Sequence, residues 1–204
     1  MRVQLSDHFT YPRLLRFTLP SITMMIFTSI YGVVDGLFVS NFVGKTAFAA
    51  VNFIMPLLMG MGALGFMVGS GGSALVSRTL GEGDRDKAEG IFSMLVYVTL
   101  AAGVALALLG QLFLCPIAAA LGAEGEMLEN CVLYGRILLL STGPFMLQNV
   151  FQSFFVVAER PHLGLTVTVA AGLTNMTLDL LFVGVLGFGL PGAAAATVLS
   201  ECLG

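Results

Sequence analysis

Charged side chains are scarce in this sequence of 204 residues. Asp, Glu, Lys and Arg make up only 10% of it, whereas 57% of the residues are hydrophobic. A soluble domain carries about 25% charged residues. The chain lacks the polar surface that a water-soluble protein of this size needs. We therefore expect it to fold in lipid.

Cysteines, histidines and catalytic motifs are also sparse. The three cysteines have no paired spacing, and the two histidines, His8 and His162, fall in flanking segments. No Walker, HExxH or GxSxG motif is present. GMGALG at residues 60–65 matches GxGxxG but lies inside an apolar run, where small residues favour close helix packing over nucleotide binding. We therefore expect neither an enzyme nor a disulfide, and no cofactor beyond a possible ion.

Long apolar segments are what the sequence has in abundance. About 20 helical residues cross a bilayer core of about 30 Å. The chain divides into six such segments, the last cut short by the C-terminus. They cover residues 14–39, 46–76, 88–114, 127–157, 163–188 and 191–204. We predict an all-α membrane protein, a bundle of six transmembrane helices. Residues 116–122 are expected to form a separate short interfacial helix.

The basic residues are placed unevenly between these segments. Under the six-helix scheme seven of the nine fall on one side: Arg2, Arg13, Arg16, Arg78, Arg85, Lys87 and Arg160. The positive-inside rule places that side in the cytoplasm. We therefore predict a multi-pass protein of the plasma or inner membrane with a cytoplasmic N-terminus. Arg136 has no explanation in this scheme.

Two carboxylates, Asp35 and Asp179, are predicted to lie at membrane depth, and Glu201 in the last helix is a third candidate. An Asp at the centre of a membrane helix costs about 2.5–3.5 kcal/mol on insertion scales, so such residues mostly face cavities and mark ion or proton pathways. Residues four apart share a helix face. This spacing joins Tyr31 to Asp35, Asn175 to Asp179, and Thr197 to Glu201.

These faces, with Gln148, Asn149 and Gln152 of the fourth segment, are expected to line one polar pocket in the outer half of the membrane. Its carboxylate, amide and hydroxyl oxygens suit Na⁺ and equally a proton shared between acids. Alternative readings stay open, since Asp35 is close enough to its helix end to reach the interface. Pro20 removes a backbone hydrogen bond inside the first helix and favours a kink there.

Several separated motifs resemble the multidrug and toxic compound extrusion (MATE) family. They are LPS around Pro20, YGVVDGLFVSNFVG at residues 31–44, GSGGSALVSRTLGEGD at residues 69–84, NMTLDLLF at residues 175–182 and LGFGLPGAAAATVLSE at residues 186–201. The resemblance covers essentially the whole chain. It implies one lobe, the N-terminal one, of a transporter with about twelve helices in two lobes. The second lobe is absent from these 204 residues.

The resemblance also implies a function. Family members export organic, often cationic, compounds in exchange for Na⁺ or H⁺. The cation site is expected at Asp35, Asn175, Asp179 and Thr197, with Tyr31, Asn149 and Gln152 as nearby pocket residues and Pro20 as a hinge. The implied partners are membrane lipid, organic cations, the coupling cation and either a C-terminal lobe or a second copy of the chain. No nucleic-acid partner is expected.

Two other functions remain possible from the sequence. A lipid-linked oligosaccharide flippase of related architecture needs basic residues around its cavity, for which only Arg136 is a candidate. A non-transporting membrane scaffold, or a truncated product, would bind no ion.

Overall fold

The computed structural model describes residues 11–204 and consists of helices, with no strand in that range. The expected all-α class is therefore confirmed. In chain order the elements are α1 (Tyr11–Phe38), η1 (Val39–Val43), α2 (Lys45–Gly81), α3 (Arg85–Ala120), α4 (Gly125–Leu139), α5 (Thr142–Val157), α6 (Pro161–Asp179), η2 (Leu180–Val185) and α7 (Gly189–Leu203). Arg2 and His8 lie outside the described residues, as do the side chains of Arg13 and Arg16.

Four described helices are long and apolar enough to cross a membrane, and the pair α4 and α5 forms a fifth span if it is counted as one. The first and fourth of these spans continue from α-helix into π-helix at η1 and η2. Helix α7 contributes 15 helical residues, fewer than a full crossing requires. The chain is a multi-pass membrane protein.

The fourth predicted span, residues 127–157, was wrong as a single helix. It is broken at Leu140 and Ser141 into α4 and α5, which are bent by 58°. Pro144 explains the break, because it has no N–H to donate to the carbonyl of Leu140 and its ring clashes with that carbonyl. Proline is tolerated in the first turn of a helix, and Pro144 falls in the first turn of α5.

The separate interfacial helix predicted for residues 116–122 was also wrong. Helix α3 continues through Pro116 and ends at Ala120. Its end is closed by a Schellman arrangement, in which the Ala123 N–H donates to the Ala118 carbonyl at 3.0 Å. Gly122 has φ 103°, a conformation that glycine adopts at no steric cost.

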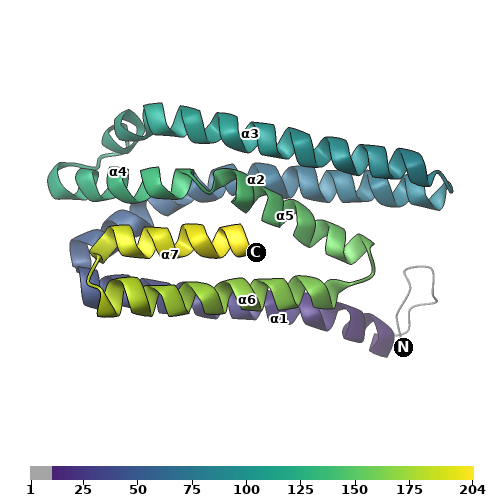
Figure 1. Ribbon diagram of the computed structural model, residues 1–204, viewed down its shortest axis with the longest axis horizontal. Coiled ribbons are helices and arrows are strands. Elements are labelled where there is room, and N and C mark those ends of the chain that lie inside the picture. Colours follow the sequence, from purple (N-terminus) through teal and green to yellow (C-terminus); the bar gives the residue numbers. More distant parts are fainter. Residues whose placement is uncertain (1–10) are drawn as a thin grey trace.

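The helices pack in two groups (Figure 1). Helix α2 packs on α3, α4 and α5, whereas α1 packs mainly on α6. Helix α7 joins the groups by packing on both α4 and α6. Helices α1 and α2 are consecutive in the sequence yet hardly touch. A space between them is therefore left for the cavity described below.

Close packing of α2 on α5 depends on glycine. A Cβ atom at Gly65 would lie 2.7 Å from the Met146 carbonyl oxygen, and one at Gly69 would lie 2.9 Å from the Val150 Cα. Both contacts are with backbone, which cannot move aside without shifting α5. GMGALG thus lies within α2, and its Gly65 serves helix packing as the sequence predicted.

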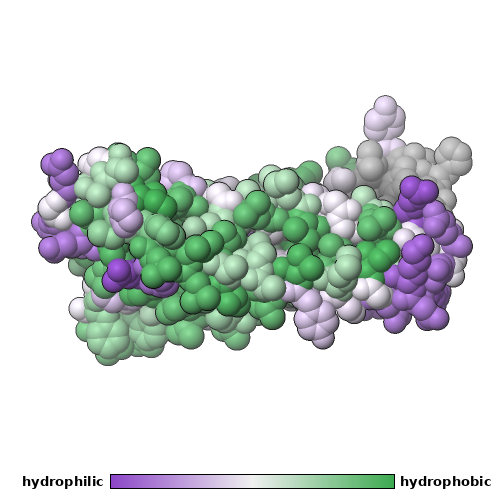
Figure 2. Space-filling model, turned by 90° about the horizontal axis from the view of Figure 1, so that it is seen from above, coloured by the Kyte–Doolittle hydropathy of each residue, from purple (hydrophilic) through white to green (hydrophobic). Residues whose placement is uncertain are grey.

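The molecule has two polar ends and an apolar middle (Figure 2). One end, which we name the α3–α4 end, carries Glu124, Glu126 and Glu129 near the start of α4. The opposite end, the α2–α3 end, carries Arg78 and Arg85 beside the turn between those helices. Large exposed hydrophobic side chains such as Met94, Leu108 and Leu112 cover the helix surfaces between the two ends. This pattern is that of a bundle surrounded by lipid.

Candidate functional site

A cavity of ≈ 690 Å³ lies between the two groups of helices. Helices α1, α2, α4, α5, α6 and α7 all contribute to its wall. Its polar lining includes Tyr31, Asp35, Asn52, Thr142, Gln148, Asn149, Gln152, Thr168, Asn175, Thr197, Ser200 and Glu201. Six of the seven residues predicted for the cation site and its pocket therefore line one space. The seventh, Asp179, is completely buried and does not line the cavity.

Asp35 of α1 and Asp179 of α6 are brought together because α1 packs along α6. Their carboxyl groups are close enough to interact electrostatically. Asp179 is completely buried, and Asp35 faces the cavity. Two carboxylates held together away from water repel each other unless a cation or a shared proton lies between them. The pair is thus suited to hold one positive charge.

Asn175 and Thr197 complete this group, which we call the acidic cluster (Asp35, Asn175, Asp179 and Thr197). The Asn175 amide donates to the Thr197 hydroxyl at 3.4 Å, which ties α6 to α7. That leaves the Asn175 Oδ1 free as an acceptor. Among the described residues, Asp35 Oδ1, Asn175 Oδ1 and both Asp179 carboxylate oxygens are buried without a hydrogen-bond partner. Buried oxygens without donors are costly and suit a hard cation or a proton.

No group of three His, Cys, Asp or Glu residues within residues 11–204 is arranged to hold a metal ion. The acidic cluster supplies only two carboxylates, with an amide and a hydroxyl oxygen. This donor set fits a monovalent hard cation better than a transition metal, which prefers nitrogen or sulfur ligands.

Tyr134 is a member of this site that the sequence did not reveal. It is completely buried, and its hydroxyl has no hydrogen-bond partner among the described residues but is close enough to Asp35, Asp179 and Thr197 to interact with them. Helix α4 places it there by packing on α7. Tyr134 gave no signal in the sequence, because a tyrosine in an apolar segment is as often a core residue as a site residue. It contributes a hydroxyl that can donate to, or accept from, the acidic cluster.

Glu201 contributes a third carboxylate to the cavity. The Ser141 hydroxyl donates a hydrogen bond to its Oε2 atom. Ser141 stands at the break between α4 and α5, so this contact links the break to α7. The sequence placed Glu201 on the Thr197 face of its helix but assigned it no role. Ser141 was not predicted as a site residue, because the sequence did not predict the break between α4 and α5 at which it lies.

The remaining predicted residues have definite positions. Asn149 donates to the Phe145 carbonyl at 2.8 Å, and Gln152 donates to Thr168 at 3.5 Å. Tyr31 lies one turn from Asp35 on the cavity face of α1. Pro20 is buried within α1, which continues through it as one α-helix, and it does not line the cavity. Its role as a hinge therefore stays a prediction.

The two π-helical segments adjoin the acidic cluster. Asp179 is the last residue of α6 before η2, and η2 contacts η1 at the end of α1. Short π-segments interrupt the regular hydrogen-bond ladder and occur frequently at functional sites. Here both lie at the α3–α4 end of the bundle, beside the two helices that carry the carboxylates (Figure 1).

Comparison with known proteins gives a consistent picture. The MatE family model matches residues 20–181. The chain is 26% identical over 193 residues to the multidrug export protein MepA of Staphylococcus haemolyticus (strain JCSC1435), covering 95% of this chain and 43% of that protein. It thus spans less than half the length of this relative.

Solved structures resemble the fold closely. One is the outward-facing conformation of a multidrug resistance MATE family transporter of the MOP superfamily, with a TM-score of 0.86 and 29% identity over 92% of this chain and 41% of that one. An inward-facing conformation of a multidrug resistance MATE family transporter has a TM-score of 0.80 and 29% identity, over 86% of this chain and 40% of that one. The described helices therefore correspond to one lobe of such a transporter.

Proposed function

The chain belongs to the MatE family, and from this premise we propose that it is the cation-binding unit of a multidrug export antiporter. MepA is named as a multidrug export protein, and the outward-facing structure is named as a multidrug resistance transporter. In the proposed activity, organic cations leave the cell in exchange for Na⁺ or H⁺ entering it. The observation that carries this proposal is the approach of Asp35 to Asp179 among buried oxygens that have no donor.

The coupling ion binds, in this proposal, at the acidic cluster. A cation or proton there relieves the repulsion between Asp35 and Asp179 and gives the orphaned oxygens a partner. Binding therefore stabilises the arrangement in which α1 and α6 are packed together at this level. Movement of one elementary charge down the membrane potential provides about 2.3 kcal/mol per 100 mV to drive the exchange.

The exported compound binds in the adjoining cavity. Its lining combines apolar side chains, such as Met24, Met55 and Phe145, with the carboxylates of Asp35 and Glu201. Flexible methionines adapt to ligands of different shape, and the carboxylates favour positive charge. None of the described residues that line the cavity is Lys or Arg, which argues against the flippase alternative because a pyrophosphate needs basic partners.

A second six-helix unit completes the transporter in this proposal. Part of the cavity lining is widely exposed, since Met25 of α1 is 68% and Met59 of α2 is 64% accessible. These residues border the side on which α1 and α2 do not meet. The partner is either a C-terminal lobe or a second copy of this chain. We place the protein in the plasma or inner membrane with its α2–α3 end in the cytoplasm, following the positive-inside rule.

Ion binding to the purified chain tests the proposal. Thermal unfolding in detergent is followed in increasing NaCl, with choline chloride added to keep the ionic strength constant, and is repeated at several pH values. A ligand that binds only the folded state stabilises it by about 2.7 kcal/mol at 100 times its Kd. We expect saturable stabilisation by Na⁺, or in its place by lowered pH, that is lost in Asp35→Asn and Asp179→Asn.

Asp86→Asn is the matched control, because Asp86 is exposed in the first turn of α3 and far from the cluster. It should keep the response of the original chain. Equal responses in Asp179→Asn and Asp86→Asn would refute the cation site. A complete absence of response to Na⁺ and pH in the original chain would favour the scaffold alternative.

A further inference from the structure

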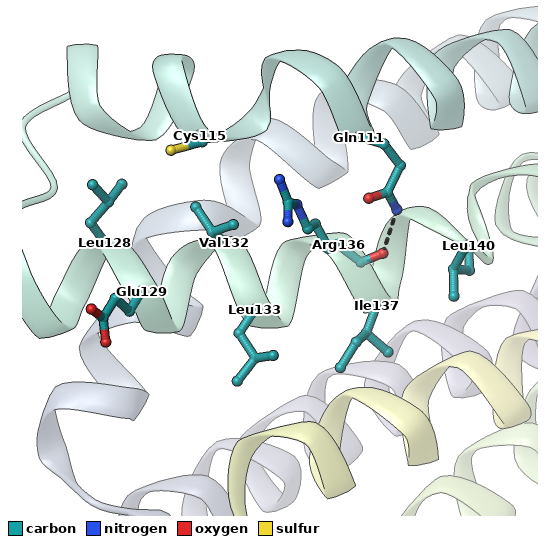
Figure 3. Close-up of a pocket in the computed structure, with 9 residues that line it drawn as sticks. All are labelled: Gln111, Cys115, Leu128, Glu129, Val132, Leu133, Arg136, Ile137 and Leu140. Atoms are coloured by element: carbon teal, nitrogen blue, oxygen red, sulfur yellow. Dashed lines mark hydrogen bonds between the residues drawn. The ribbon is translucent and has the colours of Figure 1, made fainter.

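A second concavity, separate from the cavity described above, lies on the outer surface of the bundle. It is a groove of ≈ 770 Å³ between α3 and α4. Figure 3 shows its lining of Gln111 and Cys115 from α3, and Leu128, Glu129, Val132, Leu133, Arg136, Ile137 and Leu140 from α4 or its end. Four of these side chains are branched aliphatic residues on α4, and Leu140 directly after its end is a fifth. The groove thus offers an apolar wall with two charges in it.

Arg136 is the unusual member of this groove. Its backbone carbonyl accepts a hydrogen bond from the Gln111 amide at 2.7 Å, which fixes α4 against α3. Its side chain is exposed and reaches from α4 toward α3, with the guanidinium between Val132 and Gln111 (Figure 3). Within residues 11–204 this guanidinium has neither a hydrogen bond nor an ion pair, since the salt bridge of the described chain joins Arg78 to Glu82. An unpaired charge on a lipid-facing surface calls for a partner from outside the chain.

The depth of Arg136 follows from two neighbouring long helices, if the middle of each is taken as the centre of the bilayer. Gln111 lies between eight and nine residues from the middle of α3, or about 13 Å along its axis. Ile54, whose side chain is 3.4 Å from the Cβ position of Gly135, lies nine residues from the middle of α2, which is about 13.5 Å. The core of a bilayer extends about 15 Å from its centre. Arg136 therefore lies near the boundary between acyl chains and headgroups, toward the α3–α4 end.

At that depth the anionic group that surrounds the protein is the phospholipid phosphate. Arginine binds phosphate with two parallel N–H donors, and the bond is stronger than one between neutral groups. The aliphatic residues that flank Arg136 on α4 provide contact for an acyl chain. A peptide or a soluble anion would have to leave water to reach this position, whereas a lipid is already there.

Glu129 adds selectivity to this groove. It lies seven residues before Arg136, on the same face of α4 and closer to the helix start. A second negative charge on the lipid headgroup would be repelled by Glu129, whereas an ammonium group would be attracted. Ethanolamine phospholipids carry an ammonium two carbons beyond the phosphate. The order of charges on α4, basic at the acyl boundary and acidic nearer the surface, matches the order in such a headgroup.

We propose that the groove between α3 and α4 is a binding site for a zwitterionic phospholipid of the phosphatidylethanolamine class. Arg136 holds the phosphate, Glu129 holds the ammonium, and Val132, Leu133 and Leu140 contact the acyl chains. This site is independent of the acidic cluster, since no residue lines both the groove and the cavity.

Native mass spectrometry of the delipidated chain in detergent tests the proposal. The chain is titrated with phosphatidylethanolamine, phosphatidylglycerol and diacylglycerol of identical acyl composition, and bound lipid is counted. We expect phosphatidylethanolamine to bind best and diacylglycerol least. Arg136→Gln should weaken phosphatidylethanolamine binding about tenfold, the loss expected for one charge-assisted hydrogen bond. Glu129→Gln should keep phospholipid binding but abolish the preference for phosphatidylethanolamine over phosphatidylglycerol.

Two controls match these variants. Arg160→Gln removes an exposed arginine at the α2–α3 end, and Glu126→Gln removes an exposed acid of α4 that does not line the groove. Both should bind lipid as the original chain does. Unchanged binding in Arg136→Gln, equal binding of diacylglycerol and phospholipid, or a preference of the original chain for phosphatidylglycerol would each overturn the proposal. Arg136→Lys, which keeps the charge but not the paired donors, should lie between Arg136→Gln and the original chain.

Discussion

The hydroxyl of Ser141 donates to the carboxylate of Glu201, 60 residues further along the chain. The same hydroxyl lies 2.9 Å from the Leu138 carbonyl. A serine has one proton to donate, so it cannot serve both acceptors at once. When Glu201 is ionised, Ser141 donates to it; when Glu201 carries a proton, Glu201 can donate to Ser141 and release Ser141 to Leu138. The break between α4 and α5 is thus tied to a carboxylate in the cavity.

Ser141→Ala should destabilise the fold because it leaves Glu201 without this donor. A hydrogen bond to a charged group contributes about 1.5–3 kcal/mol, and we expect a loss in the lower part of that range because Glu201 reaches the cavity. Ser200→Ala is the matched control, since Ser200 donates only to the Thr197 carbonyl of its own helix. Chemical unfolding of both variants in detergent measures the difference. Equal losses would show that the link between Ser141 and Glu201 adds nothing to stability.

Gly65→Ala should destabilise the chain by about 1–3 kcal/mol, the usual cost of overpacking. The added methyl group would meet the backbone of Met146, so α2 and α5 would have to separate. Gly71→Ala on the same helix provides the contrast, because no atom lies within 4 Å of its Cβ position. Alanine there should stabilise the helix by about 0.5–1 kcal/mol. Thermal unfolding that moves in the same direction for both variants would contradict the packing argument.

Thr197→Val tests the oxygen ligands of the proposed cation site with little change in shape. The valine removes the hydroxyl that accepts from Asn175. We expect the Na⁺ affinity, measured by the stabilisation titration described above, to fall roughly tenfold, which corresponds to about 1.4 kcal/mol. Thr177→Val is the control, since Thr177 is exposed and bonds only to the Leu173 carbonyl. The role assigned to Thr197 is wrong if both variants keep the original affinity.

Glu201→Gln should weaken the binding of an organic cation to the cavity without changing the response to Na⁺. Glu201 lines the cavity but is not a member of the acidic cluster. Binding of tetraphenylphosphonium to the purified chain, measured by equilibrium dialysis, is expected to fall about tenfold on loss of one favourable charge interaction. Glu126→Gln, at the exposed start of α4, should bind as the original chain does. An unaltered affinity in Glu201→Gln would exclude this carboxylate as an anchor.

The orientation in the membrane is tested by labelling. Single cysteines are introduced at Asp84 and Glu126, in a background without native cysteines, and intact cells are treated with a membrane-impermeant maleimide. Glu126→Cys should react in intact cells, because the positive-inside rule places the α3–α4 end outside. Asp84→Cys should react only after permeabilisation. The reverse pattern would invert the proposed topology.

The composition and the spacing of polar residues predicted much of the fold and of the candidate site. The low charge indicated lipid as the solvent, and most of the long apolar runs fall in long helices of the structure. The spacing of four residues placed Tyr31 and Asp35 on one helix face, and both line the cavity; Asn175 lines it too, whereas Asp179 is completely buried and does not. The break at Leu140 was not predicted, although Pro144 is evident in the sequence. Residues 127–157 are apolar throughout, and hydropathy does not report the backbone hydrogen bond that a proline removes.

The sequence by itself determined the solvent, the class of fold and which polar residues share a helix face, since these follow from residue type and from a period of 3.6 residues. Only the tertiary structure decided that Asp35 meets Asp179, that Tyr134 lies near them, that Ser141 contacts Glu201 and that Arg136 points into the groove between α3 and α4. The rotation of each helix about its axis, and the choice of its neighbour, depend on close contacts spread over the whole bundle. Glycine contacts such as that between Gly65 and Met146 set those rotations, and no single segment encodes them.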